Sequence, residues 1–389
     1  MIPLSYTQCS NTNEFLLRAL GVAEFYGFVP FDELPKSRAA RFPRISPNSL
    51  NFVRKDERAL VPLVHNCARR NLAALPSSLF WRNSLKREGA GTASIELHVI
   101  GIQGAMAEAL LITIANAIAK DAGVQNVVTG INSIGSADSS ARYVRELSVY
   151  LRKHADSLPD NLLSRAVEDP VGTMVHLAEK GHPIAERAPQ STEFLNEEER
   201  QHLRLLLEFL EANDIFYELN PFVLGSRDCW THTLFEMRAV DPDTQNLISF
   251  VYGGRYDSLV SMCPSAGIFA AGMSIVYERR GTGPLKTNRQ IPERQLYLAH
   301  LGIEAKRKSI RVLEILRQSQ IPVYHSLTHD LMADQITEAK RLNVPFILVI
   351  GHKEALENTA LVRDTRTNAQ WAIPIPELPG YLRRRRLGA

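Results

Sequence analysis

The C-terminal quarter of the chain alternates strand-like and helix-like segments, and this alternation constrains the fold more than any other feature. Residues 295–301, 322–325 and 346–350 have the length and composition of strands. Residues 306–318 and 331–341, which lie between them, place apolar side chains at helical spacing. Short strands that alternate with such helices are typical of a small α/β domain built on parallel strands.

A polar stretch rich in glycine and proline, residues 281–291, separates this region from the preceding chain. We therefore expect a core domain at 1–285, a linker at 286–293 and a second domain at 294–389. Helical signals broken by four prolines over about 140–215 predict a helical insertion within the core.

The remaining core pattern is a set of strands around one buried helix. Residues 84–104 read as two strands around a small-residue turn, because Ile95, Leu97 and Val99 alternate with polar residues. Residues 105–122 form an apolar helix pattern. Further strand patterns occur at 127–135, 216–219, 233–237 and 247–252.

Charge is distributed unevenly along the chain. From Lys286 to the C-terminus there are 17 lysines and arginines against 10 acidic residues, a net +7, which leaves −4 for residues 1–285. A basic C-terminal domain would attract a polyanion such as RNA. A solvated surface that ends in the Arg383–Arg386 tail explains the same excess equally well.

Cysteine usage and hydropathy predict a cytoplasmic protein. Cys9, Cys67, Cys229 and Cys263 lie far apart without a C-x-x-C pair, so we expect neither a metal site nor disulfides. No run of about 18 apolar residues predicts a membrane span. The N-terminal residues lack the pattern of a secretory signal.

The most specific local signal is the octet YGGRYDSL at Tyr252–Leu259. Gly253 and Gly254 let a backbone approach a ligand closely, because neither carries a Cβ atom. Arg255 and Asp257 can contact that ligand, or they can only stiffen a glycine turn as an ion pair. In isolation the octet leaves both readings open.

Several segments, in order along the chain, resemble histidyl-tRNA synthetases. The octet is similar to the GGRYD segment that lines the amino-acid pocket of those enzymes. The other similar segments are motif 1, the two strands of motif 2, the D-Y-Y-x-x-T-x-F-E segment, motif 3 and the anticodon-binding domain, at 26–35, 85–99, 228–236, 272–279 and 294–389. Motif 3 is expected to be a strand leading into a helix that ends in Glu278-Arg279.

The resemblance implies a mixed α/β fold, a class II synthetase antiparallel sheet flanked by helices, plus a C-terminal α/β domain of the anticodon-binding type. Through motif 1 it implies a homodimer. It also implies tRNA or a tRNA-like RNA as partner, with no role for DNA or a membrane. An active member would use ATP with Mg²⁺ to convert histidine to an aminoacyl-adenylate.

The resemblance assigns expected roles to individual residues. Arg87 would meet the α-phosphate and Arg279 the γ-phosphate, since guanidinium groups present fixed forks to phosphate oxygens. The alternative readings are an exposed strand arginine for Arg87 and a helix arginine paired with an acid for Arg279. The residues expected around the amino acid are Asp56, Gln103, Arg227, Trp230, Gly253, Gly254, Arg255 and Tyr256.

Four positions depart from the family pattern. Val276 replaces the glycine that leaves room for the adenine ring, and its stiff β-branched side chain could fill that slot. Arg227 lies two places from the expected carboxylate-binding arginine. Arg58 replaces a threonine beside Asp56, and Gln103 replaces the glutamate that helps hold the imidazole.

The sequence therefore leaves open whether the chain is an enzyme. One hypothesis is a divergent histidine-type aminoacyl-tRNA ligase. A second is a non-catalytic paralogue that binds RNA, a nucleotide or a protein, as the regulatory subunit of ATP phosphoribosyltransferase does in histidine biosynthesis. That subunit usually lacks an anticodon-binding domain, which favours RNA binding here. A third hypothesis is a dimeric scaffold without a small ligand.

Overall fold

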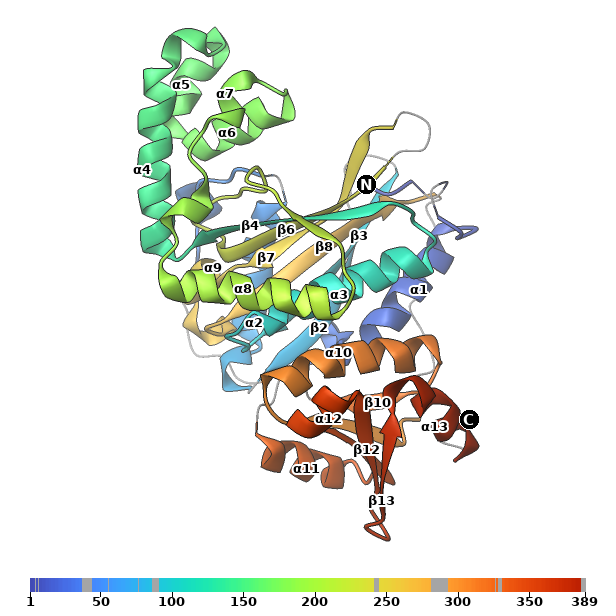
Figure 1. Ribbon diagram of the computed structural model, residues 1–389. Helices are drawn as coiled ribbons and strands as arrows, with labels where there is room; N and C mark the ends of the chain where they lie inside the picture. The colour runs from blue at the N-terminus through green and yellow to red at the C-terminus, as the bar shows by residue number, and fades with distance from the viewer. Residues whose placement is uncertain are drawn as a thin grey trace.

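Two β-sheets organise the molecule in the computed structural model (Figure 1). The model describes residues 1–3, 5, 7–36, 44–54, 56–75, 77–85, 91–240, 245–280, 293–325, 327 and 331–385. The first sheet has eight strands in the order β1-β2-β3-β8-β7-β6-β4-β5. Its strands are β1 (Val29–Pro30), β2 (Ser78–Leu85), β3 (Thr92–Ile100), β4 (Val127–Gly135), β5 (Tyr217–Leu219), β6 (Thr231–Val240), β7 (Leu247–Arg255) and β8 (Ala270–Glu278).

The large sheet is antiparallel from β2 to β4, and its outermost strands β1 and β5 are added in parallel. Alternation along β3 sorts its side chains between two faces. Ile95, Leu97 and Val99 are fully buried in the core that also contains α1 (Thr12–Phe25) and α3 (Met106–Asp121). The polar residues between them therefore project to the opposite face of the sheet.

The predicted helices and strands of the core are largely confirmed. The strand expected at 127–135 is β4, and the buried helix expected at 105–122 is α3. The first strand of the motif 2 pair begins at Ser78, earlier than expected, because residues 78–85 pair with β3 over their whole length. On the other face of the sheet lie α2 (Glu57–Arg69) and the short α9 (Asp257–Ser261), which follows β7 in the chain.

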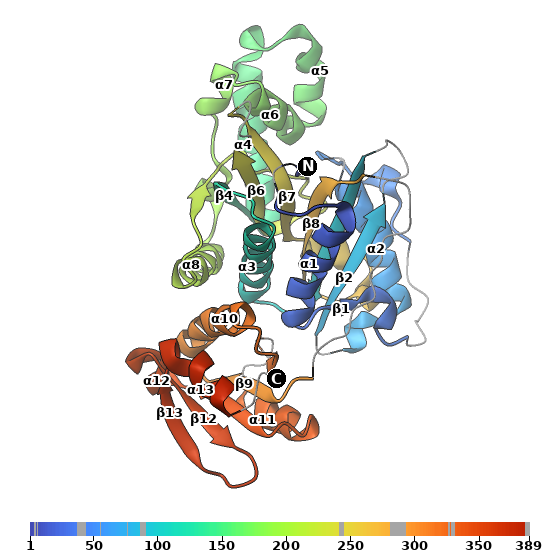
Figure 2. The same cartoon turned by 90° about the vertical axis from the view of Figure 1, so that its right-hand side faces the viewer.

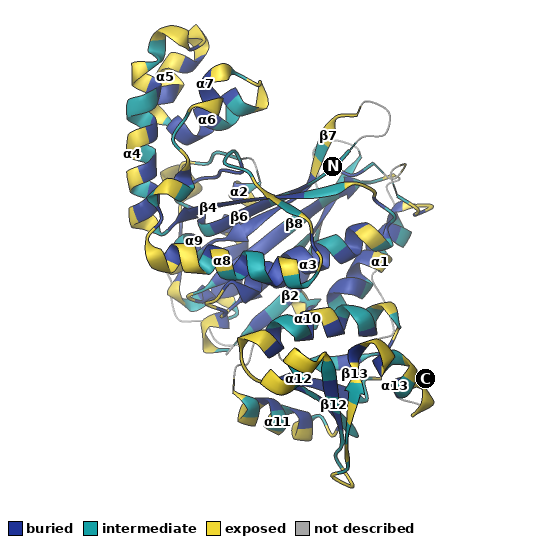
Figure 3. Ribbon diagram, viewed as in Figure 1, coloured by how far each residue is buried: buried dark blue, intermediate teal, exposed yellow. Residues whose placement is uncertain are grey.

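The insertion between β4 and β5 is helical, as expected. Four of its helices project beyond the sheet in Figure 1: α4 (Ala137–Lys153), α5 (Asp160–Glu168), α6 (Pro170–Glu179) and α7 (Pro183–Glu186). The fifth, α8 (Glu197–Ala212), begins at a capping box formed by Asn196 and Glu199 and packs against α3. Much of the outer surface of the projecting helices is exposed (Figure 3).

The C-terminal region forms the second sheet, in the order β10-β9-β11-β12-β13. Its first three strands are parallel and the last two form an antiparallel hairpin, so the predicted α/β pattern is confirmed. The elements are β9 (Leu296–His300), α10 (Ile303–Gln318), β10 (Val323–His325), α11 (Met332–Arg341), β11 (Phe346–Ile350), α12 (His352–Glu357), β12 (Thr359–Asp364), β13 (Gln370–Pro374) and α13 (Leu378–Arg384).

Helix α10 joins the two sheets (Figure 2). The Arg317 guanidinium contacts Glu314 on its own helix and Asp121 at the end of α3, with Nη1 2.5 Å from an Asp121 carboxylate oxygen. The Tyr26 hydroxyl donates to Glu314 at 2.9 Å. The expected linker, apart from Glu293, lies outside the described residues.

Candidate functional site

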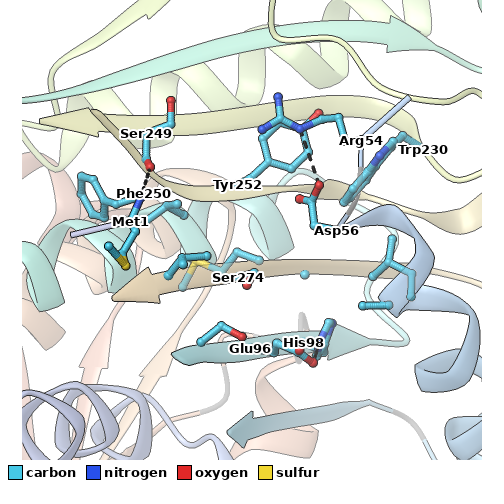
Figure 4. Close-up of a pocket in the computed structure, with 17 residues that line it drawn as sticks. Met1, Arg54, Asp56, Glu96, His98, Trp230, Ser249, Phe250, Tyr252 and Ser274 are labelled. Atoms are coloured by element: carbon cyan, nitrogen blue, oxygen red, sulfur yellow. Dashed lines mark hydrogen bonds and ion pairs between the residues drawn. The ribbon is translucent and has the colours of Figure 1, made fainter. Parts of the chain in front are cut away.

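A cavity of about 380 Å³ lies on the face of the large sheet opposite α3 (Figure 4). Strands β3, β7 and β8 form its floor, and the segment before α2 and Trp230 complete its walls. The side chains that face it from β3 are Ser94, Glu96 and His98, which alternate with the buried Ile95 and Leu97. The polar half of the β3 pattern therefore lines a cavity.

His98 is held in one orientation by two neighbours. Its Nδ1 atom lies 3.0 Å from the hydroxyl oxygen of Tyr256. A methyl group on Gly272, which pairs with His98 across β3 and β8, would overlap Nδ1, so only glycine leaves room for this ring. Burial lowers the pKa of the imidazole, although Glu96 acts in the opposite direction, and the ring is neutral at pH 7.

Glu96 lies between two nitrogen groups. Its Oε2 atom is 3.7 Å from Nη1 of Arg82 on β2 and 3.8 Å from Nε2 of His98. Arg82 and Glu96 face each other across the β2–β3 ladder and therefore lie on the same side of the sheet. This group places one carboxylate and one imidazole at the floor of the cavity, with the Arg82 guanidinium beside the carboxylate.

Arg54, Asp56 and Tyr252 form another wall. The Arg54 guanidinium carbon lies 3.6 Å from the centre of the Tyr252 ring, and Arg54 Nε is 3.7 Å from Asp56 Oδ1. Burial opposes the charge on Arg54, but Tyr252 and nearby carboxylates outweigh it and raise the pKa of the guanidinium. Arg54 is therefore a fixed cation stacked on an aromatic ring.

The buried carboxylate of Glu57 holds this wall in place. It accepts the backbone N–H groups of Val53, Arg54 and Ser226 and the indole N–H of Trp230, at 2.7–3.0 Å. Burial raises its pKa, against the effect of these hydrogen bonds. Glu57 thus positions Trp230 and the Arg54 backbone without lining the cavity itself.

A second cavity, of about 350 Å³, lies between the same wall and the helical insertion. Arg54 and Asp56 line both cavities, and Arg165, His176 and Glu179 of α5 and α6 line only the second. The Arg54–Asp56 pair therefore separates the central cavity from the insertion.

The structure brings only some of the sequence-predicted residues to the central cavity. Asp56 and Trp230 line it. Gly253 and Gly254 lie in β7 where the strands pack closely: a methyl group on Gly253 would lie 2.6 Å from the Gly272 carbonyl oxygen. Tyr256 is fully buried and reaches the cavity through its contact with His98.

Arg255 is fully buried and faces α3, on the opposite side of the sheet from the cavity. Its Nε and Nη2 atoms donate to the two oxygens of Glu108 at 2.9 and 2.7 Å. Nη1 and Nη2 also donate to the carbonyl oxygens of Ile102 and Gly104 at 3.0 and 2.8 Å. This network ties the GGRYD segment to the start of α3.

The remaining predicted residues lie elsewhere. Arg227 is exposed in the loop before β6, and Gln103 is exposed in the turn between β3 and α3. Arg279 follows β8, where its backbone N–H donates to Gly91, and it is absent from the described lining of the cavity. Arg87 lies outside the described residues.

The expected transition from strand to helix in motif 3 is wrong, because β8 continues as a strand to Glu278. The β-branched Ile275 and Val276 favour this conformation, and β3 pairs with β8 as far as Glu278. On the other edge of β8, the pairing with β7 ends at Ile275, and Ile2 pairs with the residues beyond it. The Ile2 N–H donates to the Val276 carbonyl oxygen at 2.9 Å, and the Ile2 carbonyl oxygen accepts from the Glu278 N–H at 2.8 Å. Val276 lines the cavity, as do Met1 and Phe250, which lie together in Figure 4.

Arg54, Arg82, Glu96, His98 and Tyr252 are the site residues that the sequence reasoning missed. Glu96 and His98 carried a usable signal, since they alternate with apolar residues in a predicted strand. Such alternation indicates a polar face but does not distinguish a face toward solvent from one toward a cavity.

Two further observations concern the whole described chain. Among the described residues, no group of three or more histidine, cysteine, aspartate or glutamate side chains is arranged to hold a metal ion. Within the same residues, no helix has both the length and the apolar character needed to cross a membrane.

Comparison with known proteins agrees with this architecture. Residues 295–385 match the anticodon binding domain family. The histidine–tRNA ligase of Acaryochloris marina is 28% identical over 300 residues, which cover 75% of this chain and 69% of that protein. The Bacillus subtilis histidine–tRNA ligase is 26% identical over 284 residues, covering 72% and 67%. The structure of apo S. aureus histidyl-tRNA synthetase aligns over 97% of this chain and 98% of that one, with 18% identity and a TM-score of 0.48.

The large, mostly antiparallel sheet and the anticodon-binding-type C-terminal unit define a class II aminoacyl-tRNA-synthetase-like protein. Within that class, the curated relatives that the chain matches are histidine–tRNA ligases, so it is a histidyl-tRNA-synthetase-like protein.

Proposed function

We propose that this protein binds a free amino acid in the central cavity and an RNA of the tRNA type through its C-terminal unit, without ATP-dependent activation of the amino acid. The observation that carries the proposal is the composition of the cavity. Asp56 supplies a carboxylate for an ammonium group, while Trp230 and Tyr252 supply aromatic walls. Fixed polar groups beside aromatic walls are typical of sites for small polar ligands.

The arrangement of the arginines argues against activation. An adenylate-forming reaction needs cations at the developing phosphate charge. Arg279, the arginine expected at the γ-phosphate, is not among the described residues that line the cavity. Arg54 does line it, but its guanidinium is stacked on Tyr252 and lies beside the Asp56 carboxylate. A member of the family that activates histidine would use ATP with Mg²⁺ at this site.

ATP–pyrophosphate exchange with each of the twenty amino acids tests the absence of activation. We expect no exchange with any of them, while isothermal titration calorimetry detects binding of at least one amino acid. Exchange above the rate without amino acid would overturn the proposal and restore the ligase function.

The C-terminal surface supports RNA binding. Arg383, Arg384 and Arg385 are exposed at the end of α13, and the Arg385 guanidinium carbon lies 4.6 Å from the centre of the Trp371 ring. Arginines close to aromatic rings suit both the phosphate backbone and the bases of RNA. The net +7 of residues 286–389 adds a long-range attraction.

Fluorescence anisotropy with labelled tRNA at several salt concentrations tests RNA binding. We expect the logarithm of the affinity to fall linearly with the logarithm of the salt concentration. Replacing both Arg384 and Arg385 with glutamine should lower the slope by about 0.7–0.9 for each phosphate that the protein no longer neutralises. Arg152→Gln with Lys153→Gln, two exposed residues of α4, is the matched control. Salt-independent or undetectable binding by the full chain would exclude this function.

We also propose that the protein is a cytoplasmic homodimer, as the motif 1 resemblance implies. Size-exclusion chromatography with light scattering tests the dimer: a mass of about 87 kDa, twice the 43.6 kDa of the chain, is expected. A monomer at micromolar concentration would contradict this part of the proposal.

A further inference from the structure

Glu96 and His98 present a paired hydrogen-bond acceptor and donor to the central cavity. They lie side by side on the cavity face of β3 (Figure 4). Oε2 of Glu96 and Nε2 of His98 are 3.8 Å apart, and Nε2 has no hydrogen-bond partner among the described residues. A ligand group that reaches this pair therefore meets a nitrogen without a hydrogen-bond partner among the described residues, beside a carboxylate oxygen.

The neighbours of His98 set which of its nitrogens carries the proton. The Glu96 carboxylate lies 3.8 Å from Nε2 and favours a proton on that nitrogen of the neutral imidazole. Nδ1 then accepts a hydrogen bond from the Tyr256 hydroxyl. His98 accordingly presents an N–H group to the cavity.

Glu96 is an ionised acceptor with a compensating cation. Arg82 lies 3.7 Å from the same oxygen and balances its charge. The Glu96–His98 pair and Arg82 therefore carry no net charge together. The pair is best satisfied by an uncharged group that has a donor and an acceptor next to each other.

A carboxamide has this arrangement, because its NH₂ group donates to the carboxylate while its carbonyl oxygen accepts from Nε2–H. A carboxylate would place its charge against Glu96. A neutral imidazole carries its donor and acceptor on ring nitrogens that point in divergent directions, and a protonated one has only donors. We propose, on the basis of the amino-acid site proposed above, that the cavity selects an amino acid with a carboxamide side chain, glutamine or asparagine, over histidine.

Calorimetric titration of the full chain with L-glutamine, L-asparagine, L-glutamate, L-aspartate and L-histidine tests this selectivity. We expect one of the two amides to bind at least tenfold more tightly than both its own acid and histidine. Equal or tighter binding of L-histidine would overturn the selectivity and leave the amino-acid site intact. Binding of none of the five would also overturn the selectivity, and the amino-acid site itself fails if none of the twenty amino acids binds.

Glu96→Gln distinguishes a contact with the ligand from a purely structural role of Glu96. The new side-chain amide can donate to a carboxylate, so the preference for the amide over the matching acid should fall at least tenfold while the amide still binds. Glu198→Gln, at an exposed position of α8, is the matched control and should keep the original preference. An unchanged preference in Glu96→Gln, in a protein with the original circular dichroism spectrum, would refute the proposal.

The protonation of His98 can be measured without any ligand. Long-range ¹H–¹⁵N spectra of the imidazole nitrogens should show the proton on Nε2, and Tyr256→Phe should produce a mixture of tautomers. A proton on Nδ1 in the unaltered protein would refute the donor assigned to His98.

Discussion

Replacing Arg255 with methionine should destabilise the core by about 3–5 kcal/mol, the usual cost of removing one partner of a buried ion pair. Arg255 is fully buried and donates four hydrogen bonds, two to Glu108 and two to backbone carbonyls. Methionine fills most of the volume but leaves the Glu108 carboxylate buried, with His202 at 2.8 Å as its remaining partner. The loss is a large fraction of an ordinary stability of about 5–15 kcal/mol.

The pH dependence of this loss identifies its cause. Burial opposes ionisation of Glu108, but Arg255 and His202 outweigh it, so the pKa of Glu108 is lowered in the folded protein. A lowered folded-state pKa gives stability that is present above the unfolded pKa of about 4.3 and lost at lower pH. In Arg255→Met the carboxyl is desolvated without its guanidinium and its pKa rises. The deficit should therefore be largest near pH 7.5 and shrink toward pH 5.

Urea unfolding monitored by tryptophan fluorescence measures the effect. Trp371 of β13 is first replaced by phenylalanine, so that the two remaining tryptophans, Trp81 and Trp230, report only the core sheet. In this background we compare Arg255→Met with Arg255→Met combined with Glu108→Gln. The second change removes the unpaired charge and should recover part of the stability.

An Arg255→Met protein that unfolds within about 1 kcal/mol of the original, but no longer binds its amino acid, would refute this reasoning. That result would support the pocket role that the family resemblance implies for Arg255. Arg255→Lys separates the cases further. It keeps the charge but cannot satisfy Glu108 and both carbonyls at once, so its stability should be intermediate.

Three further changes test other parts of the molecule. Val276→Gly should create or increase binding of a fluorescent ATP analogue, and unchanged affinity would show that Val276 does not limit the cavity. Burial opposes the charge on Glu199, but hydrogen bonds led by Ser136 lower its pKa to about 2. Glu199→Gln should cost about 1–3 kcal/mol above pH 5, and its deficit should disappear as the pH falls toward 2; Glu198→Gln should change little. Arg317→Gln, which removes the link between α10 and α3, should separate the calorimetric unfolding of the two sheets, whereas a single unshifted transition would show that the link is unimportant.

The elements that the sequence predicted well are those whose burial follows a local period. Strand β4 and helix α3 are buried over most of their length, and the apolar runs at 127–135 and 105–122 mark them directly. The alternation of strand and helix patterns in the C-terminal region predicts its parallel strands equally directly. Strand β2 was placed too late, because its register depends on pairing with β3 and not on its own pattern.

The candidate site was less predictable because its residues meet across long sequence separations. Asp56 and Trp230 were found through the family resemblance, not through any local pattern. The partner of Arg255 is Glu108, 147 residues earlier, on a helix that the sequence shows only as apolar. No spacing rule connects Arg255 with Glu108. The sequence alone therefore does not show whether Arg255 binds a ligand or pairs with a buried carboxylate.

The residues that carry the family resemblance and those that define the cavity are largely different. Gly253 and Gly272 are required by packing: a methyl group on Gly253 would lie 2.6 Å from the Gly272 carbonyl oxygen, and one on Gly272 would overlap His98. Gly253 is fixed by the geometry of the sheet whatever ligand the cavity takes, whereas Gly272 is required because His98 lies against it. Glu96, in contrast, faces the cavity between apolar residues, and His98 beside it is buried against Phe80 and Tyr256. Motifs that are kept by packing, such as Gly253 with the buried Arg255, can therefore persist while the residues that meet the ligand change.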